Sequence, residues 1–384
     1  MEERFANPYP CWLYGIEGIG NKTISSLLSR VSCAEEIYSM TQDELFQCLY
    51  EITERKADAA KKAALITKAH RERPEEVVSK LQQKGISFVS TENELFPRRL
   101  RDIQDCPYGL YYIGSLPPEE YPSVAIVGAR NCSGYGREQA RVFAEKLALR
   151  GISVVSGMAR GVDGIAGRAA LMAGGNSYAV LGCGVDVIYP TENTELYYML
   201  SDKGGLLSES RPGAEPRVQL FPRRNRLISG LSDAVLVIEA RRRSGTVITV
   251  DAALEQGRDI FALPGRVSDS LSDGCNLLIS QGAAIACSPD TVIEHFWGVT
   301  DSGTDFSEQA RKARNRRGAS LSGLEYVLFS QLGFGEIMEA EFLLHRAESI
   351  IGKYISVEEF VAAMVSLQVK GFAVEIGAGH YKGV

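Results

Sequence analysis

Short apolar runs rich in valine and isoleucine recur through the middle of the chain, and each ends in a glycine-containing turn. Such runs are typical of strands that are buried on both faces of a sheet. Helix-like segments separate the runs, so the pattern predicts an α/β fold with a doubly wound, mostly parallel sheet between about 123 and 298. The runs are SVAIVGAR (123–130), ISVVSGMARGVD (152–163), YAVLGCGVD (178–186), AVLVIEARRRSGT (234–246) and IFALPGR (260–266).

The glycine turns are expected to meet, because all strands of a parallel sheet end on the same edge and their turns then surround one crevice. In the first turn, Gly128 lets the backbone approach an anion, and Arg130 adds a fork of donors. Ser156 and Ser244 each precede a predicted helix, where a serine either caps the helix or binds a phosphate oxygen. The crevice is therefore predicted to bind phosphate.

The segments on either side of the sheet predict further domains. Residues 1–80 form a helical pattern in which Gly18 and Gly20 precede a helix. This Gly-x-Gly turn suits either a helix–hairpin–helix that presents amides to phosphate or a simple tight turn; Asn21 stands where a Walker A loop needs lysine. Extra strands are expected at 86–90 and 110–114. A polar linker is predicted at 300–320, and a winged-helix-like domain at 321–384.

The composition is that of an ordinary globular protein, with 45% hydrophobic and 23% charged residues. The net charge of −6 excludes a globally basic nucleic-acid binder, so such a site must be a local patch. The segment 217–243 supplies one, with seven arginines against two acids on two expected loops beside the crevice. A run of this kind is otherwise a solvated surface.

Several functional classes are not expected. The eight cysteines form no CxxC pair and the four histidines show no zinc spacing, which predicts free thiols in a reducing cytoplasm and no metal. Neither a signal peptide nor an apolar run of membrane-spanning length is present. The Gly182–Gly184 pair is an incomplete dinucleotide fingerprint, and no histidine falls in a crevice turn. We therefore expect a cytoplasmic protein without a cofactor that binds a ligand instead of transforming it.

Long, ordered motifs between 90 and 298 resemble the DprA/Smf family of DNA-processing proteins. They are SGMARGVDGIAGRAAL, LGCGVDVIYPTEN, LLSESRPGAEP, FPRRNRLISGLSDAVLVIEA, SGTVITVDAALEQGRDIFALPG and DGCNLLISQGA. The resemblance implies an extended Rossmann-like domain at 81–299 that binds single-stranded DNA. It also implies a role in natural transformation, RecA as a partner, and a homodimer joined through that domain. It implies no enzymatic activity, and no association with a membrane is expected.

The predicted site combines the phosphate turns with the family's arginine motif. Phe221 is expected either to stack on a base or to belong to the core, and Arg224, Asn225 and Arg226 to contact the strand. The full set is Gly128, Ala129, Arg130, Ser156, Gly157, Met158, Gly182, Gly184, Phe221, Arg224, Asn225, Arg226, Ser244, Gly245, Thr246, Pro264 and Gly265.

Two other functions fit the same sheet. Nucleotide phosphoribohydrolases of the lysine-decarboxylase-like group carry a catalytic glutamate in a P-G-G-x-G-T-x-x-E motif, where this chain has Thr249. A threonine cannot supply the carboxylate, which disfavours that chemistry. The crevice also suits a small-nucleotide sensor.

Overall fold

The computed structural model describes residues 7–297, 321, 323–332, 337–370, 373–377 and 379–383. The described residues up to 297 belong to one compact unit, and those from 321 onward belong to a second. The predicted linker at 300–320 lies outside the described residues. In the described parts of the chain, no helix is long and apolar enough to cross a membrane.

A nine-stranded sheet organises the first unit, in the order β1-β2-β6-β5-β4-β3-β7-β8-β9. Strands β3 to β9 are parallel to one another, whereas β1 and β2 add antiparallel pairs at one edge. The strands are β1 Ser87–Ser90, β2 Gly109–Gly114, β3 Ser123–Val127, β4 Ser153–Ser156, β5 Ser177–Val180, β6 Gly205–Ser208, β7 Ala234–Val237, β8 Asp259–Ala262 and β9 Ala284–Ile285. The predicted mostly parallel α/β fold is confirmed.

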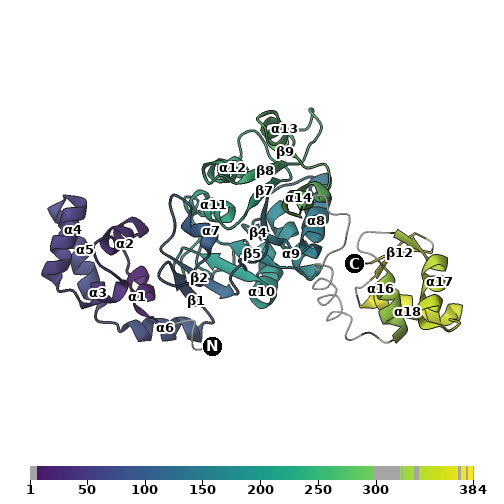
Figure 1. Ribbon diagram of the computed structural model, residues 1–384, viewed down its shortest axis with the longest axis horizontal. Coiled ribbons are helices and arrows are strands. Elements are labelled where there is room, and N and C mark those ends of the chain that lie inside the picture. The colour runs from purple at the N-terminus through teal and green to yellow at the C-terminus, as the bar shows by residue number, and fades with distance from the viewer. Residues whose placement is uncertain are drawn as a thin grey trace. The chain divides into compact units, whose positions relative to one another are not determined.

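Helices cover both faces of this sheet, as Figure 1 shows for α8 and α9 on one side and α11 and α12 on the other. The helices of this part are α7 Arg98–Arg101, α8 Gly134–Leu149, α9 Val162–Met172, the 3₁₀ turn Thr191–Asn193, α10 Thr194–Lys203, α11 Leu220–Gly230, α12 Gly245–Glu255, α13 Asp273–Ser280 and α14 Pro289–Trp297.

The central strand β3 shows why an apolar run in the sequence predicts a buried strand. Val124 and Ile126 pack into the core with Phe143 of α8, while Ala125 and Val127 pack into the opposite core with α11 and α12. Every residue of β3 is buried. An uninterrupted apolar run is what a strand covered on both faces requires.

The N-terminal helices pack on the antiparallel edge of the sheet. They are α1 Tyr9–Gly15, α2 Asn21–Leu28, α3 Ala34–Ser39, α4 Gln42–Thr53, α5 Lys56–Ala69 and α6 Pro74–Gln83. Phe88 of β1 and Tyr111 of β2 belong to the same buried cluster as these helices. The Asn21 amide, at the start of α2, donates to Cys106 O at 2.8 Å and accepts from Tyr108 N at 2.6 Å. The Gly-x-Gly turn is thereby anchored to the body of the unit.

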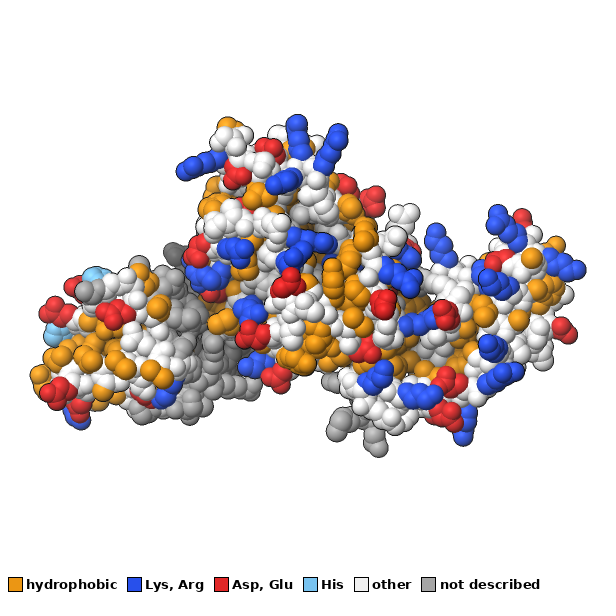
Figure 2. All heavy atoms as spheres, turned by 180° about the vertical axis from the view of Figure 1, so that it is seen from behind, with side chains coloured by type: hydrophobic (Ala, Val, Ile, Leu, Met, Phe, Trp, Pro, Cys, Tyr) orange, Lys and Arg blue, Asp and Glu red, His pale blue; other side chains and the backbone are white. Residues whose placement is uncertain are grey.

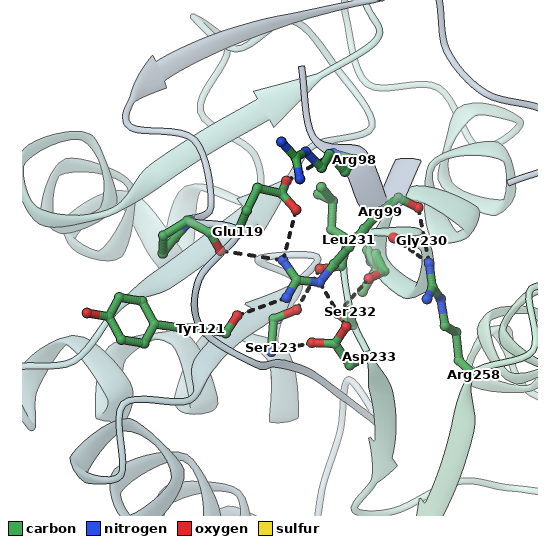
Figure 3. A network of polar contacts seen from close by, with 12 residues as sticks. Arg98, Arg99, Glu119, Tyr121, Ser123, Gly230, Leu231, Ser232, Asp233 and Arg258 are labelled. Carbon is green, nitrogen blue, oxygen red and sulfur yellow. Dashed lines mark hydrogen bonds and ion pairs between the residues drawn. The ribbon is translucent and has the colours of Figure 1, made fainter. Parts of the chain in front are cut away.

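A polar network holds the amino ends of β3 and β7 together, opposite their glycine turns (Figure 3). Arg99 Nε donates to Asp233 Oδ1 at 2.8 Å, and its Nη2 donates to Tyr121 O at 2.9 Å. The second oxygen of Asp233 accepts from Ser123 N at 2.8 Å. The Arg99 side chain is only 14% exposed, so its ion pair is partly shielded from water. This network steadies the two strands whose other ends bear the site.

The second unit consists of helices and a small sheet. Its elements are α16 Gly323–Gln331, β10 Ile337–Glu339, α17 Ala340–Ile351, α18 Val357–Val369, β11 Ala373–Gly377 and β12 His380–Gly383. The sheet order is β10-β12-β11, with both pairs antiparallel. The helical pattern and the closing hairpin predicted for this region are both present.

Candidate nucleic-acid interface

The carboxyl ends of β3 and β7 border a cavity of about 580 Å³, which we name the switch-point cavity. The two strands are neighbours, but the chain continues from β3 to β4 on one side and from β7 to β8 on the other. Open α/β sheets bind their ligands at such a reversal of strand order. The lining residues come from the loop after β3, the start of α9, helix α11 and the segment from Ala240 into α12.

The loop after β3 forms one wall of the cavity through close backbone packing. A Cβ on Gly128 would lie 2.7 Å from Val162 Cγ2, and a Cβ on Gly161 would lie 2.3 Å from Ala129 O. Gly161 also has a φ of +74°, which favours glycine. Together these glycines let the loop turn sharply beside α9. Arg130 lies two residues after Gly128, is exposed, and lines the cavity as predicted.

The N-terminus of α12 forms the facing wall. Ser244 is its N-cap residue but makes no side-chain capping bond, and its Oγ is buried without a partner among the described residues. Gly245 and Thr246 continue into the first helical turn and line the same cavity. Amides in the first turn of a helix have no acceptor within the helix and carry partial positive charge. This end of α12 is therefore suited to an anion.

The arginine motif forms a helix, α11, and not the loop expected from the sequence. Pro222 lies in its first turn, where a missing N–H costs no hydrogen bond. Arg224 and Arg226 are two residues apart, so their side chains leave the helix about 200° apart. Their surroundings differ accordingly.

Arg224 is buried, with 7% of its surface exposed. Its Nη1 donates to Gly157 O at 2.8 Å and also to Val180 O, and so links α11 to the ends of β4 and β5. Burial lowers the pKa of the Arg224 guanidinium to about 10, while the nearby Asp163 carboxylate acts in the opposite direction. The structure therefore gives Arg224 a structural role in the wall of the cavity that it lines, and its contact with DNA stays a prediction.

Arg226 points away from the switch-point cavity. Its Nη2 lies 2.5 Å from Glu209 Oε1 and its Nε lies 3.3 Å from Asp105 Oδ2. Its side chain is only 15% exposed and is held by these two carboxylates, and its contact with DNA stays a prediction. Asn225 lies between the two arginines and lines the cavity, with Nδ2 3.4 Å from Gly245 O.

The polar groups in the turn after β4 form hydrogen bonds within the protein. Ser156 and Met158 are buried, and Ser156 Oγ accepts from Met158 N at 3.3 Å. Asp163 Oδ2 accepts from Gly157 N at 3.0 Å, so this carboxylate caps the turn. Burial raises the pKa of Asp163, and Arg224 opposes the rise. The three predicted residues of this turn support the cavity wall, and their hydrogen bonds leave little for a phosphate.

Phe221 sits at the junction of the switch-point cavity and a smaller adjoining one. A Cβ on Gly182 would lie 2.7 Å from Phe221 Cδ1, so the glycine makes room for the ring. Tyr189 stacks on the same ring, with centroids 5.6 Å apart and planes inclined by 30°. Tyr189 lines both cavities and was missed from the sequence; the signal was the aromatic residue in LGCGVDVIYPTEN, downstream of the glycine turn.

Three more predicted residues lie outside these two cavities and shape neighbouring loops. A Cβ on Gly184 would lie 2.7 Å from Arg211 O. Gly265 N donates to Asn276 Oδ1 at 3.2 Å, and a Cβ there would collide with Ser272. Pro264 precedes it in the same loop. The loop ends at Leu271, whose O accepts from Ala240 N at 2.8 Å, and so it helps to place the segment before α12.

The cavity lining is cationic. Its titratable side chains are Arg130, Arg224, Arg241, Tyr189 and Asp163. Arg241 begins an exposed triplet of arginines, and Figure 2 shows Lys and Arg side chains gathered over the part of the unit that holds α12 and α13. Exposed cations, an open helix N-terminus and an aromatic pair thus lie around one cavity of an α/β sheet, a combination suited to an anion that carries a planar group.

Comparison with known proteins identifies the family. Residues 87–297 match the model of the DNA recombination-mediator protein A family. The protein Smf of Escherichia coli is 35% identical over 303 residues, which span 79% of each chain. The chain therefore belongs to this family, the DprA/Smf DNA-processing proteins.

Two solved structures are similar. The DNA processing protein A of Streptococcus pneumoniae matches with a TM-score of 0.64 and 33% identity, over 75% of this chain and 97% of that one. The Helicobacter pylori protein, solved in a study of its single-stranded DNA binding mode, matches with a TM-score of 0.50 and 32% identity. That match covers 55% of this chain and 95% of the other.

Proposed function

We propose that this protein binds single-stranded DNA of any sequence in the switch-point cavity and acts by binding, without catalysis. The observation that carries the proposal is the meeting of exposed Arg130, the uncapped N-terminus of α12 and the Tyr189–Phe221 pair around one cavity. Phosphates would lie against the first two features, and aromatic rings accept any base because every base has a π-face.

The lining chemistry supports binding over hydrolysis. Thr249 occupies the position at which phosphoribohydrolases carry their glutamate, and it lies on α12 with 2% of its surface exposed. Asp163 is the carboxylate at the cavity, and it is buried and accepts from Gly157 N. Neither residue is placed to activate water at a bound nucleotide, because a general base must reach the reacting proton.

We further propose that the protein shields incoming single strands during natural transformation and loads the RecA recombinase onto them, acting as a homodimer joined through the Rossmann-like domain. Membership of a recombination-mediator family supports the RecA role. The exposed edge strand β9, where Ile285 is 48% exposed, is compatible with self-association of that domain.

The binding proposal is tested with labelled single strands of equal length and different base composition. We expect closely similar affinities, whereas a strong preference for one sequence would indicate base-edge recognition and contradict the proposal. For the recombinase role, the rate of RecA assembly on a single strand is measured through its ATPase activity. An added excess of this protein should shorten the lag, and an unchanged lag would overturn that part. Light scattering of the free protein measures its molar mass, which should be that of two chains.

A further inference from the structure

Tyr189 is an aromatic side chain at the mouth of the switch-point cavity whose outward surface has no role in the fold. It follows β5, just before the 3₁₀ turn that leads to α10. Its surface is 40% exposed, although one ring face lies against Phe221. It lines the switch-point cavity together with Arg130, and it lines the adjoining smaller cavity as well.

Phe221 is less accessible than its place in the arginine motif suggests. Gly182 packs against the ring edge, since a Cβ there would lie 2.7 Å from Cδ1. The guanidinium carbons of Arg130 and Arg224 lie 5.6 Å and 5.9 Å from the ring centroid. Tyr189 covers it from another direction at 5.6 Å. Phe221 is thus half-buried among these neighbours and serves as the support on which Tyr189 and Arg130 are placed.

We infer that Tyr189 is the residue on which a base of the bound strand stacks, with Phe221 behind it as a rigid support. The inference rests on the proposed binding of single-stranded DNA. An aromatic ring fixed on one face and open on the other offers a stacking surface at little cost in conformational entropy. The neighbouring Arg130 places a cation where the phosphate of the same or the next nucleotide would lie.

The ligand chemistry follows from the wall beside Tyr189. Val218 and Ile248 line the same cavity as the ring and are 80% and 42% exposed, so the cavity also has an exposed apolar lining. A planar, weakly hydrated group joined to an anion fits an aromatic and apolar rim next to arginines. A nucleobase on its phosphodiester backbone has this combination. Stacking of this kind tolerates every base.

The experiment compares two ligands across a set of Tyr189 variants. One ligand is a labelled oligothymidylate, and the other is an abasic strand of equal length, which keeps the phosphates but lacks the bases. Tyr189→Ala should weaken oligothymidylate binding roughly 5- to 150-fold, the range for loss of one base–aromatic stack. It should leave binding of the abasic strand unchanged. Tyr189→Phe, which retains the ring, should stay close to wild type on both ligands.

Further variants keep the outcome interpretable. Tyr189→Leu keeps an apolar side chain of considerable size but has no aromatic ring. It should lose affinity for oligothymidylate as the alanine variant does, which separates loss of the ring from a disturbance of the loop by the small alanine side chain. Tyr198→Ala is the matched control, because Tyr198 is 61% exposed on α10 and lines neither cavity. It should bind both ligands as wild type does.

Each remaining result has a distinct meaning. Equal losses on both ligands would show that Tyr189 acts through the loop or the phosphates, and would overturn the stacking assignment. Unchanged binding of both ligands by Tyr189→Ala would overturn it as well. Wild-type protein that binds neither strand would instead overturn the proposed single-strand binding itself.

Discussion

Replacing Arg224 by alanine tests whether this arginine of the motif stabilises the folded protein. The change would leave Gly157 O and Val180 O without their donor, and Asp163 without its nearby cation. An unsatisfied buried polar group costs about 1–3 kcal/mol, and breaking a buried charge pair costs about 3–5 kcal/mol. We expect a loss of about 3–5 kcal/mol in the free energy of unfolding.

Thermal unfolding measures this loss, with Arg223→Ala as the matched control. Arg223 is the adjacent arginine of the same helix and is exposed. The Arg224 variant should melt roughly 10 °C below wild type, and the Arg223 variant should melt close to it. If both variants melt within about 2 °C of wild type, the buried hydrogen bonds do not carry the stability assigned to them.

The pH dependence of the same loss provides a second check. Burial raises the folded-state pKa of Asp163 and Arg224 opposes the rise, so removing Arg224 raises that pKa further. A carboxyl with a raised folded pKa favours the folded state at low pH, and that advantage is lost as the pH rises through the folded pKa. The deficit of Arg224→Ala should therefore be smaller at pH 5 than at pH 7, and Asp163→Asn should partly rescue the variant. A deficit that does not change with pH would refute the coupling.

Three further predictions concern the other charged residues. Arg130→Ala should leave the melting temperature unchanged and should reduce the slope of log K against log salt by about 0.7, one phosphate's share on a single strand; an unchanged slope would remove Arg130 from the contacts. Arg226→Ala should lower stability by about 1–3 kcal/mol, because Glu209 loses its buried partner, while the salt slope stays at the wild-type value. A reduced slope would instead make Arg226 a phosphate contact. Asp233→Ala should cost about 1–3 kcal/mol in denaturant unfolding, since Arg99 Nε and Ser123 N lose their acceptor, and a wild-type midpoint would show that water replaces the carboxylate.

The sequence predicted most of the buried strands of the sheet. The runs at β3, β4, β5, β7 and β8 are mostly apolar, and the structure confirms all five. Strands β6 and β9 were not singled out. The first has four residues, none of them valine or isoleucine, and the second has two residues, both exposed. A short run that lacks β-branched residues, or that is exposed, does not stand out from loops.

The location of the site could be predicted because the topology of the sheet determines where the strands end. Parallel strands bring the turns after β3 and β7 to one edge, and Arg130 and Ser244 do line one cavity. The roles within the arginine motif were not predictable in the same way. Whether Arg224 or Arg226 faces inward depends on the rotation of α11 against the sheet, which is set by tertiary packing. Tyr189 was missed because its contact with Phe221 joins residues that are distant in the sequence.

The measurement that tests the central claim most directly is fluorescence anisotropy with labelled single-stranded and duplex oligonucleotides of equal length, over a series of salt concentrations. The account predicts strong preference for the single strand and an affinity that falls steeply with salt, because phosphates meet Arg130 and the α12 N-terminus while bases must be unpaired to stack. Absence of binding, or equal affinity for the duplex, would contradict it.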